Sequence, residues 1–253
     1  MQNMEYKIEI CTNSTTSCVE AQNGGAYRVE LCAGIPEGGT TPSHGEIAVA
    51  RELLDIKLNV IIRPRGGDFL YSDIEHRVML QDIEAAKKLG VDGVVFGCLT
   101  ADGDIDMQRC RELMDAAGEM SVTFHRAFDK CRDPLQALED VIELGCDRIL
   151  TSGQQPKAEQ GIPLLRQLVE KAGERIIIMP GSGVNEDNIS FIAAETGASE
   201  FHFSARVPVK SKMKFRNEAV SMGGVNIEIN EYVQDVTSAE RVRNTISQLA
   251  PKR

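Results

Sequence analysis

Short runs of β-forming residues alternate with helix-forming segments along almost the whole sequence. The β-forming runs lie at residues 6–11, 27–32, 58–63, 93–98, 121–125, 148–152, 175–180 and 200–204. Strands that alternate with helices favour parallel pairing through right-handed crossovers. Eight such units in about 250 residues predict an α/β fold, the (β/α)₈ or TIM barrel, with an open doubly wound sheet as the alternative.

Helix start and stop signals separate these runs. Glycine ends several helical segments and leads directly into the next run, as at Gly90 and Gly145. Ser17 with Glu20, and Ser72 with Glu75, have the spacing of a reciprocal capping box. These signals place the helices between the strands, as the barrel requires.

The alternation is continuous, so we predict a single domain over residues 1–253. No change of composition and no linker interrupts it. After residue 204 the pattern weakens, and residues 206–235 are expected to form irregular chain before a last helix at 238–249. That segment is expected to cover one face of the barrel or to contact another subunit.

Charge and cysteine content narrow the class of function. The 38 acidic and 28 basic side chains give a net charge of −10, which disfavours general binding to nucleic acid or to an anionic membrane. No apolar run approaches the roughly 20 residues that span a bilayer. The seven cysteines lack CxxC spacing, and no apolar leader follows Met1. We therefore expect reduced thiols and a cytoplasmic location.

Side chains alternate across a strand, so the apolar positions of each run are expected to face the helices. The intervening positions would then point into the barrel, and they are unusually polar: Glu9, Cys11, Arg28, Glu30, Cys32, Arg63, Arg65, Thr123, His125, Arg148, Ser152, Glu200, His202 and Ser204. Buried charges need partners. Ion pairs of Arg28 with Glu9 or Glu30, and of Arg148 with Glu200, are therefore expected, with contact to a ligand as the alternative.

Two cysteines form the first candidate site. Cys11 and Cys32 share the inward parity on consecutive strands, near the carboxyl ends where active sites lie in this fold. Two neighbouring thiolates suit a soft ion such as Cu(I), and a nearby imidazole could join them. The alternative is that both cysteines simply pack as small buried side chains.

A second candidate is an anion site. Gly181, Ser182 and Gly183 follow the seventh run and are expected to open a helix capped by Asn185, whose free amides would attract an anion. The neighbouring side chains expected to take part are Arg63, Arg65, His202 and Ser204. A tight turn and arginines paired to interior acids would explain the same residues without a ligand.

A third candidate is acid–base chemistry. His125 and Asp129 follow the fifth run, and Glu9 or Glu30 could supply a second acid or base. Together with the anion site, they would suit an enzyme acting on a small anionic or phosphorylated metabolite. A histidine satisfied by a neighbouring acid is the alternative, so the sequence leaves open whether the chain is an enzyme. No GxGxxG or Walker motif occurs, and no organic cofactor is predicted.

Several longer phrases resemble one known family. They lie at residues 9–11, 28–32, 37–43 (EGGTTPS), 62–69 (IRPRGGDF), 123–129 (TFHRAFD), 150–153 and 213–217. Together they are similar to the CutC copper homeostasis family, over roughly residues 5–249.

The resemblance implies a cytoplasmic (β/α)₈ barrel that forms a homo-oligomer, such as a dimer or tetramer, with a role in copper handling. Cys11 and Cys32 match the family's cysteine pair proposed to hold Cu(I). The expected partner is therefore a copper ion, or otherwise a small anionic metabolite. An interaction scaffold, which would expose large apolar patches, is a third possibility.

Overall fold

The computed structural model describes residues 6–220, 222 and 230–249. Its main sheet has eight parallel strands in the order β7-β6-β5-β4-β3-β2-β1-β8, so each strand pairs with its sequence neighbour and β1 also pairs with β8. A single parallel bridge between Gly181 and His202 links β7 to β8 and completes the circle. The strands are β1 (Lys7–Thr12), β2 (Arg28–Leu31), β3 (Lys57–Ile61), β4 (Gly93–Phe96), β5 (Ser121–Phe124), β6 (Arg148–Thr151), β7 (Ile177–Pro180) and β8 (Glu200–Phe203). The expected (β/α)₈ barrel is confirmed.

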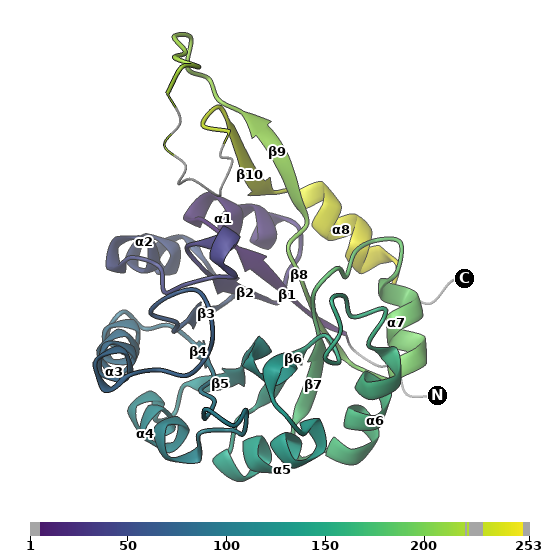
Figure 1. Cartoon of the computed structure of the whole chain (residues 1–253). Coiled ribbons are helices and arrows are strands. Elements are labelled where there is room, and N and C mark those ends of the chain that lie inside the picture. Colours follow the sequence, from purple (N-terminus) through teal and green to yellow (C-terminus); the bar gives the residue numbers. More distant parts are fainter. Residues whose placement is uncertain (1–5, 221, 223–229, 250–253) are drawn as a thin grey trace.

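Helices surround this sheet (Figure 1). They are α1 (Thr15–Asn23), α2 (His44–Leu53), α3 (Asp73–Lys88), α4 (Met107–Ala117), α5 (Pro134–Leu144), α6 (Ile162–Ala172), α7 (Ile189–Thr196) and α8 (Ala239–Ser247), with short 3₁₀ turns η1 (Ile35–Glu37) and η2 (Arg126–Lys130). Ser72 and Glu75 form the predicted capping box at α3. The one predicted at Ser17 is wrong, because α1 already begins after its N-cap Ser14. Among the described helices, none combines the length and apolar character that crossing a membrane requires.

The apolar core lies between the sheet and the helices. Strand residues of one parity, such as Ile10, Val29, Val94 and Phe201, are fully buried there. Burying a side chain of this size stabilises the fold by about 1.5–3 kcal/mol. The opposite parity is thereby directed into the barrel, as the alternation predicts.

Four charged side chains form an ion-pair layer inside the barrel, near the amino ends of the strands, which is the side opposite the carboxyl ends. They are Glu9, Arg28, Arg148 and Glu200. The guanidinium of Arg28 contacts both carboxylates, with its Nη2 2.7 Å from Glu200 Oε2, and Arg148 Nε lies 3.3 Å from the same oxygen. All four side chains are buried. The expected pairs Glu9–Arg28 and Arg148–Glu200 are confirmed, and each buried charge has an opposite charge beside it.

A two-stranded antiparallel ribbon projects from the barrel beside α1 (Figure 1). It consists of β9 (Arg206–Lys210) and β10 (Val233–Thr237). Its base is held by Asn13 Nδ2, which donates to the carbonyl of Asp235 at 2.8 Å. The segment 206–235 is therefore not irregular throughout, since both of its ends are strands; residues 221 and 223–229 of it lie outside the described part. Its contact with another subunit stays a prediction.

Candidate functional site

A cavity of about 500 Å³ opens at the carboxyl ends of the barrel strands. Most of the side chains expected to form a site line it, namely Cys11, Glu30, Cys32, Arg63, His125, Asp129, Ser182, Gly183, His202 and Ser204. Glu9, Arg65 and Gly181 do not. The cavity wall also contains Phe69, Arg126, Lys130 and Arg206, which the strand alternation did not single out.

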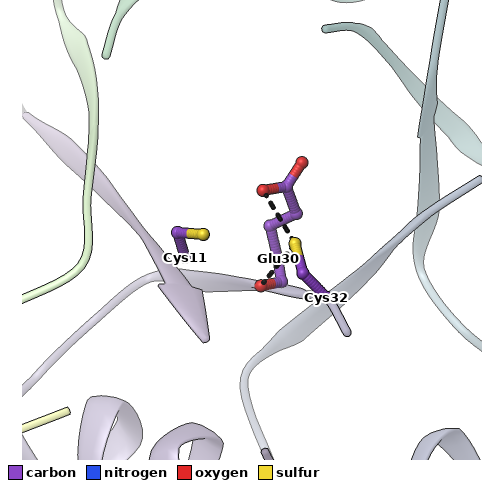
Figure 2. Close-up of side chains that lie close together, drawn as sticks. All are labelled: Cys11, Glu30 and Cys32. Atoms are coloured by element: carbon purple, nitrogen blue, oxygen red, sulfur yellow. Dashed lines mark hydrogen bonds between the residues drawn. The ribbon is translucent and has the colours of Figure 1, made fainter. Parts of the chain in front are cut away.

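Two cysteines and a glutamate form the sulfur-rich side of this cavity. Cys11 on β1 is the register partner of Glu30 on β2, and Cys32 follows β2 directly. The two Sγ atoms and a Glu30 carboxylate oxygen all lie within 4.8 Å of one another. Figure 2 shows both thiols beside the Glu30 carboxyl group, and Cys32 Sγ donates to its Oε2 at 3.4 Å. The structure thus brings together the two thiols that the sequence singled out.

His202 connects this group to the ion-pair layer below it. Its Nδ1 lies 2.7 Å from Glu9 Oε1, and its Nε2 lies 3.7 Å from Glu30 Oε2. Burial acts to lower the pKa of His202, but hydrogen bonds with Cys11 and Glu9 and the nearby carboxylates raise that pKa well above its ordinary value. Glu9 therefore serves below the cavity as the carboxylate that orients His202, since it is paired to this ring and to Arg28.

The two thiols differ in charge state. The hydrogen bond from Cys32 lowers the pKa of Cys11 well below its usual range, and His202 and Arg206 act in the same direction against the effect of burial. The same contact raises the pKa of Cys32, and burial raises it further. Burial also raises the pKa of Glu30 to about 8. These contacts favour the thiolate form at Cys11 and the thiol form at Cys32, and they leave the Glu30 carboxyl largely protonated at neutral pH.

His125 lies on another part of the cavity wall, directly after β5. Its Nδ1 accepts a hydrogen bond from the backbone N–H of Ala127 at 3.2 Å, and its ring packs against Phe69 at a centroid distance of 5.0 Å. Burial, with the positive charge of Arg63, lowers the pKa of His125 to about 3. The imidazole is therefore neutral at physiological pH and is a weak base.

Backbone carbonyls occupy both Nη atoms of Arg63, whereas its Nε has no hydrogen-bond partner among the described residues, and Arg65 does not line the cavity. The Nη atoms of Arg63 donate to the carbonyls of Glu37, Gly39 and Gly67, each at 2.8 Å, so this side chain holds two loops in place. Arg65 lies away from the cavity and pairs with acidic side chains nearby, Asp68 and Glu75. The structure does not bring Arg65 into the expected anion site.

The loop after β7 also differs from expectation. Helix α7 begins only at Ile189 with Asn188 as its N-cap, so the expected helix start at Asn185 is wrong. Asn185 instead accepts a hydrogen bond from the N–H of Asp187, which forms a local turn. Ser182 and Gly183 line the cavity without a helix N-terminus behind them, whereas Gly181 is part of the bridge to β8.

Asp129 is fully engaged in holding the loop after β6. Its carboxylate accepts from Thr151 Oγ1 at 2.6 Å and from the N–H groups of Ser152 and Gln154, and it pairs with Arg126 Nε at 2.7 Å. Its lone pairs are occupied by these contacts. An acid–base role for Asp129 stays a prediction, while its structural role is evident.

Comparisons with known proteins place this chain in a family. The model of the CutC family matches residues 6–207. The chain belongs to the CutC family. A family protein CutC of Bacteroides thetaiotaomicron is 65% identical over 243 residues, covering 96% of this chain and 97% of that protein. The human copper homeostasis protein cutC homolog is 49% identical over 238 residues, covering 94% of this chain and 87% of that protein.

A solved structure agrees with the family assignment. The crystal structure of CutC from Streptococcus agalactiae superposes on this CutC-family chain with a TM-score of 0.76 at 36% identity, covering 79% of this chain and 98% of that one. The resemblance inferred from residues 9–217 is thereby confirmed for both family and fold. The ligand of the cavity is a separate question.

Several cavity residues were missed because they lie outside the eight strands of the barrel. Arg126 and Lys130 are in η2, Phe69 is in the loop after β3, and Arg206 begins β9, where its Nη2 lies 3.4 Å from Cys11 Sγ. A search for cations just beyond the strand ends would have found Arg126, Lys130 and Arg206. For Phe69, the sequence carries no comparable signal.

Proposed function

We propose that this CutC-family chain binds Cu(I) as cargo through Cys11 and Cys32. The observation that carries the proposal is the convergence of two thiols from neighbouring strands in one cavity, where the surroundings of Cys11 lower its pKa and favour its thiolate. Thiolates are soft ligands that favour Cu(I) over hard cations. The proposal includes a cytoplasmic location, where thiols stay reduced. Assembly into a dimer or tetramer also remains a prediction.

The donor set suggests which neighbour completes the site. Glu30 offers a hard carboxylate, whereas His202 directs an imidazole Nε2 toward the same group while Glu9 holds its other nitrogen. A carboxylate behind a histidine is the usual arrangement around a ligating imidazole. We therefore expect His202 rather than Glu30 to be the third ligand, and copper binding would release its proton.

The experiment is a competition for Cu(I) between the reduced protein and a chromogenic chelator under anaerobic conditions. Wild type is expected to bind one Cu(I) per chain, and the Cys11→Ser/Cys32→Ser variant to lose at least roughly 100-fold in affinity, about 2.7 kcal/mol. Cys131→Ser is the matched control, because Cys131 is buried outside the cavity. Equal affinity of wild type and double variant would exclude the proposal.

The size and charge of the cavity favour a second candidate, a small anionic molecule. One Cu(I) ion needs only a small part of 500 Å³, whereas cavities of about 300–1,000 Å³ typically hold small organic ligands. Arg126, Lys130 and Arg206 place positive charge on its wall, in a chain whose net charge is −10. Thermal unfolding with a panel of organic acids and phosphate esters tests this candidate, and a shift that persists in the Cys11→Ser/Cys32→Ser variant is expected.

A further inference from the structure

Four buried polar atoms of cavity-lining residues have no hydrogen-bond partner among the described residues. They are Nε2 of His125, Oε1 of Glu30, and Nε of Arg63 and of Arg206. His125 and Glu30 are each only 3% exposed, so bulk water does not compensate the missing contact. Figure 2 shows Glu30 directing one oxygen toward Cys32 and the other away from both thiols. Buried polar groups are nearly always paired, so these atoms indicate a missing partner, and His125 Nε2 is the one whose direction the structure fixes most clearly.

The hydrogen-bonding character of His125 follows from its surroundings. Nδ1 accepts from the N–H of Ala127, so the ring proton must be on Nε2, which makes that atom a donor. The ring is held between Phe69 and the Cα of Gly97, where an added Cβ would lie 2.8 Å from Nδ1. Nε2–H therefore has a fixed direction before any ligand arrives.

The chemistry of this donor is restricted by charge. Burial and the nearby Arg63 keep the pKa of His125 at about 3, so the ring stays neutral. A neutral N–H held in this way recognises an uncharged or partly charged oxygen, such as a carbonyl, by a directed hydrogen bond. It does not supply the charge needed to hold an anion.

A second feature supplies that charge at the rim. Lys130 lines the cavity and is exposed, and it forms no ion pair within the described ranges. Arg126, by contrast, already pairs with Asp129. Apolar side chains, including Phe69, Leu150 and Val184, form another part of the wall. The wall thus offers a neutral hydrogen-bond donor at His125, a positive charge at Lys130 and an apolar surface.

We propose that the ligand is a small organic anion in which a carbonyl oxygen accepts from His125 Nε2 while the charged group pairs with Lys130. This inference rests on the small-molecule candidate described above and specifies its ligand class. A 2-oxo acid and the phosphate ester of a hydroxyketone share this chemistry. Copper binding is not required for it.

His125→Asn is the decisive substitution. The Asn side-chain oxygen can still accept from the N–H of Ala127, so the local turn is kept while the Nε2 donor is removed. His125→Gln places an amide N–H near the lost donor and is expected to restore part of the binding. His44→Asn is the matched control, because His44 is exposed on α2.

Calorimetric titrations use 2-oxobutyrate and dihydroxyacetone phosphate as the two carbonyl-bearing probes. Butyrate and inorganic phosphate are the matched probes without the carbonyl. His125→Asn should weaken the better carbonyl-bearing probe roughly threefold to tenfold, as expected for one neutral hydrogen bond, and leave the matched probe unchanged. Lys130→Ala should weaken all bound anions, more strongly at low salt. Which carbonyl probe binds better distinguishes a carboxylate from a phosphate ligand.

Nitrogen NMR of the imidazole gives a readout that a merely structural role would not produce. The Nε2 resonance of His125 should move on addition of the carbonyl-bearing probe and stay in place with the matched one. If the carbonyl-bearing probes bind wild type and His125→Asn with equal affinity, the inference is overturned, but the proposal that the cavity binds a small anion still stands. Failure of every probe to bind would overturn both, without bearing on Cu(I) affinity.

Discussion

Replacing Glu200 by Gln removes one negative charge from the ion-pair layer and leaves Glu9 to balance two guanidinium groups. Glu200 Oε2 lies 2.7 Å from Arg28 and 3.3 Å from Arg148, and all these side chains are buried. Removing one partner of a buried ion pair typically destabilises a protein by about 3–5 kcal/mol. For a chain of this length that corresponds to a fall in Tm of about 6–20 °C.

The assay is urea and thermal unfolding of wild type, Glu200→Gln and Glu139→Gln. The control makes the same chemical change in an exposed ion pair, Glu139–Arg175, and should have a much smaller effect because water screens it. Adding Arg148→Met to Glu200→Gln removes the excess positive charge and should recover part of the loss. Equal destabilisation by Glu200→Gln and Glu139→Gln would refute the reasoning.

The remaining predictions concern a titration, a close contact and a helix cap. Burial lowers the pKa of His125 from 6.5 to about 3, so the neutral ring contributes stability fully above pH 6.5 and loses it as the pH falls toward 3. Between pH 7 and pH 5, the free energy of unfolding measured in urea should fall by about 2 kcal/mol less in His125→Asn than in wild type. An equal fall in both proteins would contradict this. Gly161→Ala would place a Cβ 1.9 Å from the carbonyl oxygen of Ser152 and should destabilise the fold by about 3 kcal/mol. Gly45→Ala is the control: its Cβ meets nothing within 4 Å in helix α2, and the change should stabilise the fold by about 0.5–1 kcal/mol. Thermal unfolding checks both, and a tolerated Gly161→Ala would mean that the loop moves freely. Ser72→Ala removes the capping box of α3 and should lower the urea midpoint by the equivalent of about 1 kcal/mol; no change would show that the cap is dispensable.

The barrel and its interior were predictable because a strand imposes a period of two. Once the parity of β1 was assigned from its apolar residues, Glu9 and Cys11 had to point inward. The same rule placed Arg148 and Glu200 in the interior, where opposite charges had to meet. Once the fold class is known, the alternation of residues along each strand therefore predicts which side chains from distant strands meet inside the barrel.

Loop residues do not share this period, and the errors concentrate there. Arg65 lies only two residues beyond Arg63, yet it points toward Asp68 and Glu75 rather than into the cavity. Asn185 forms a local turn, so α7 starts later than its glycine-rich approach suggested. Side-chain direction in loops depends on such local hydrogen bonds, which the sequence pattern does not determine.

The ribbon and the state of His125 required the structure for another reason. Val207 pairs with Val236, and the register of two strands this far apart in sequence is set by tertiary contacts. Similarly, the sequence indicated that His125 lies near the mouth, but its tautomer depends on the N–H of Ala127. The chemistry of the site thus depends on individual hydrogen bonds, which residue type and spacing do not determine.

The charged layer beneath the cavity gives the barrel a closed end. Glu9, Arg28, Arg148 and Glu200 occupy the lumen where a tunnel would otherwise continue, and His202 stands directly on them. On the side of this layer, the cavity is bounded by paired charges rather than by open space. If Cu(I) is the cargo, as we propose, a copper acceptor would have to approach the thiols from the carboxyl ends of the strands, the same side from which the ion arrives.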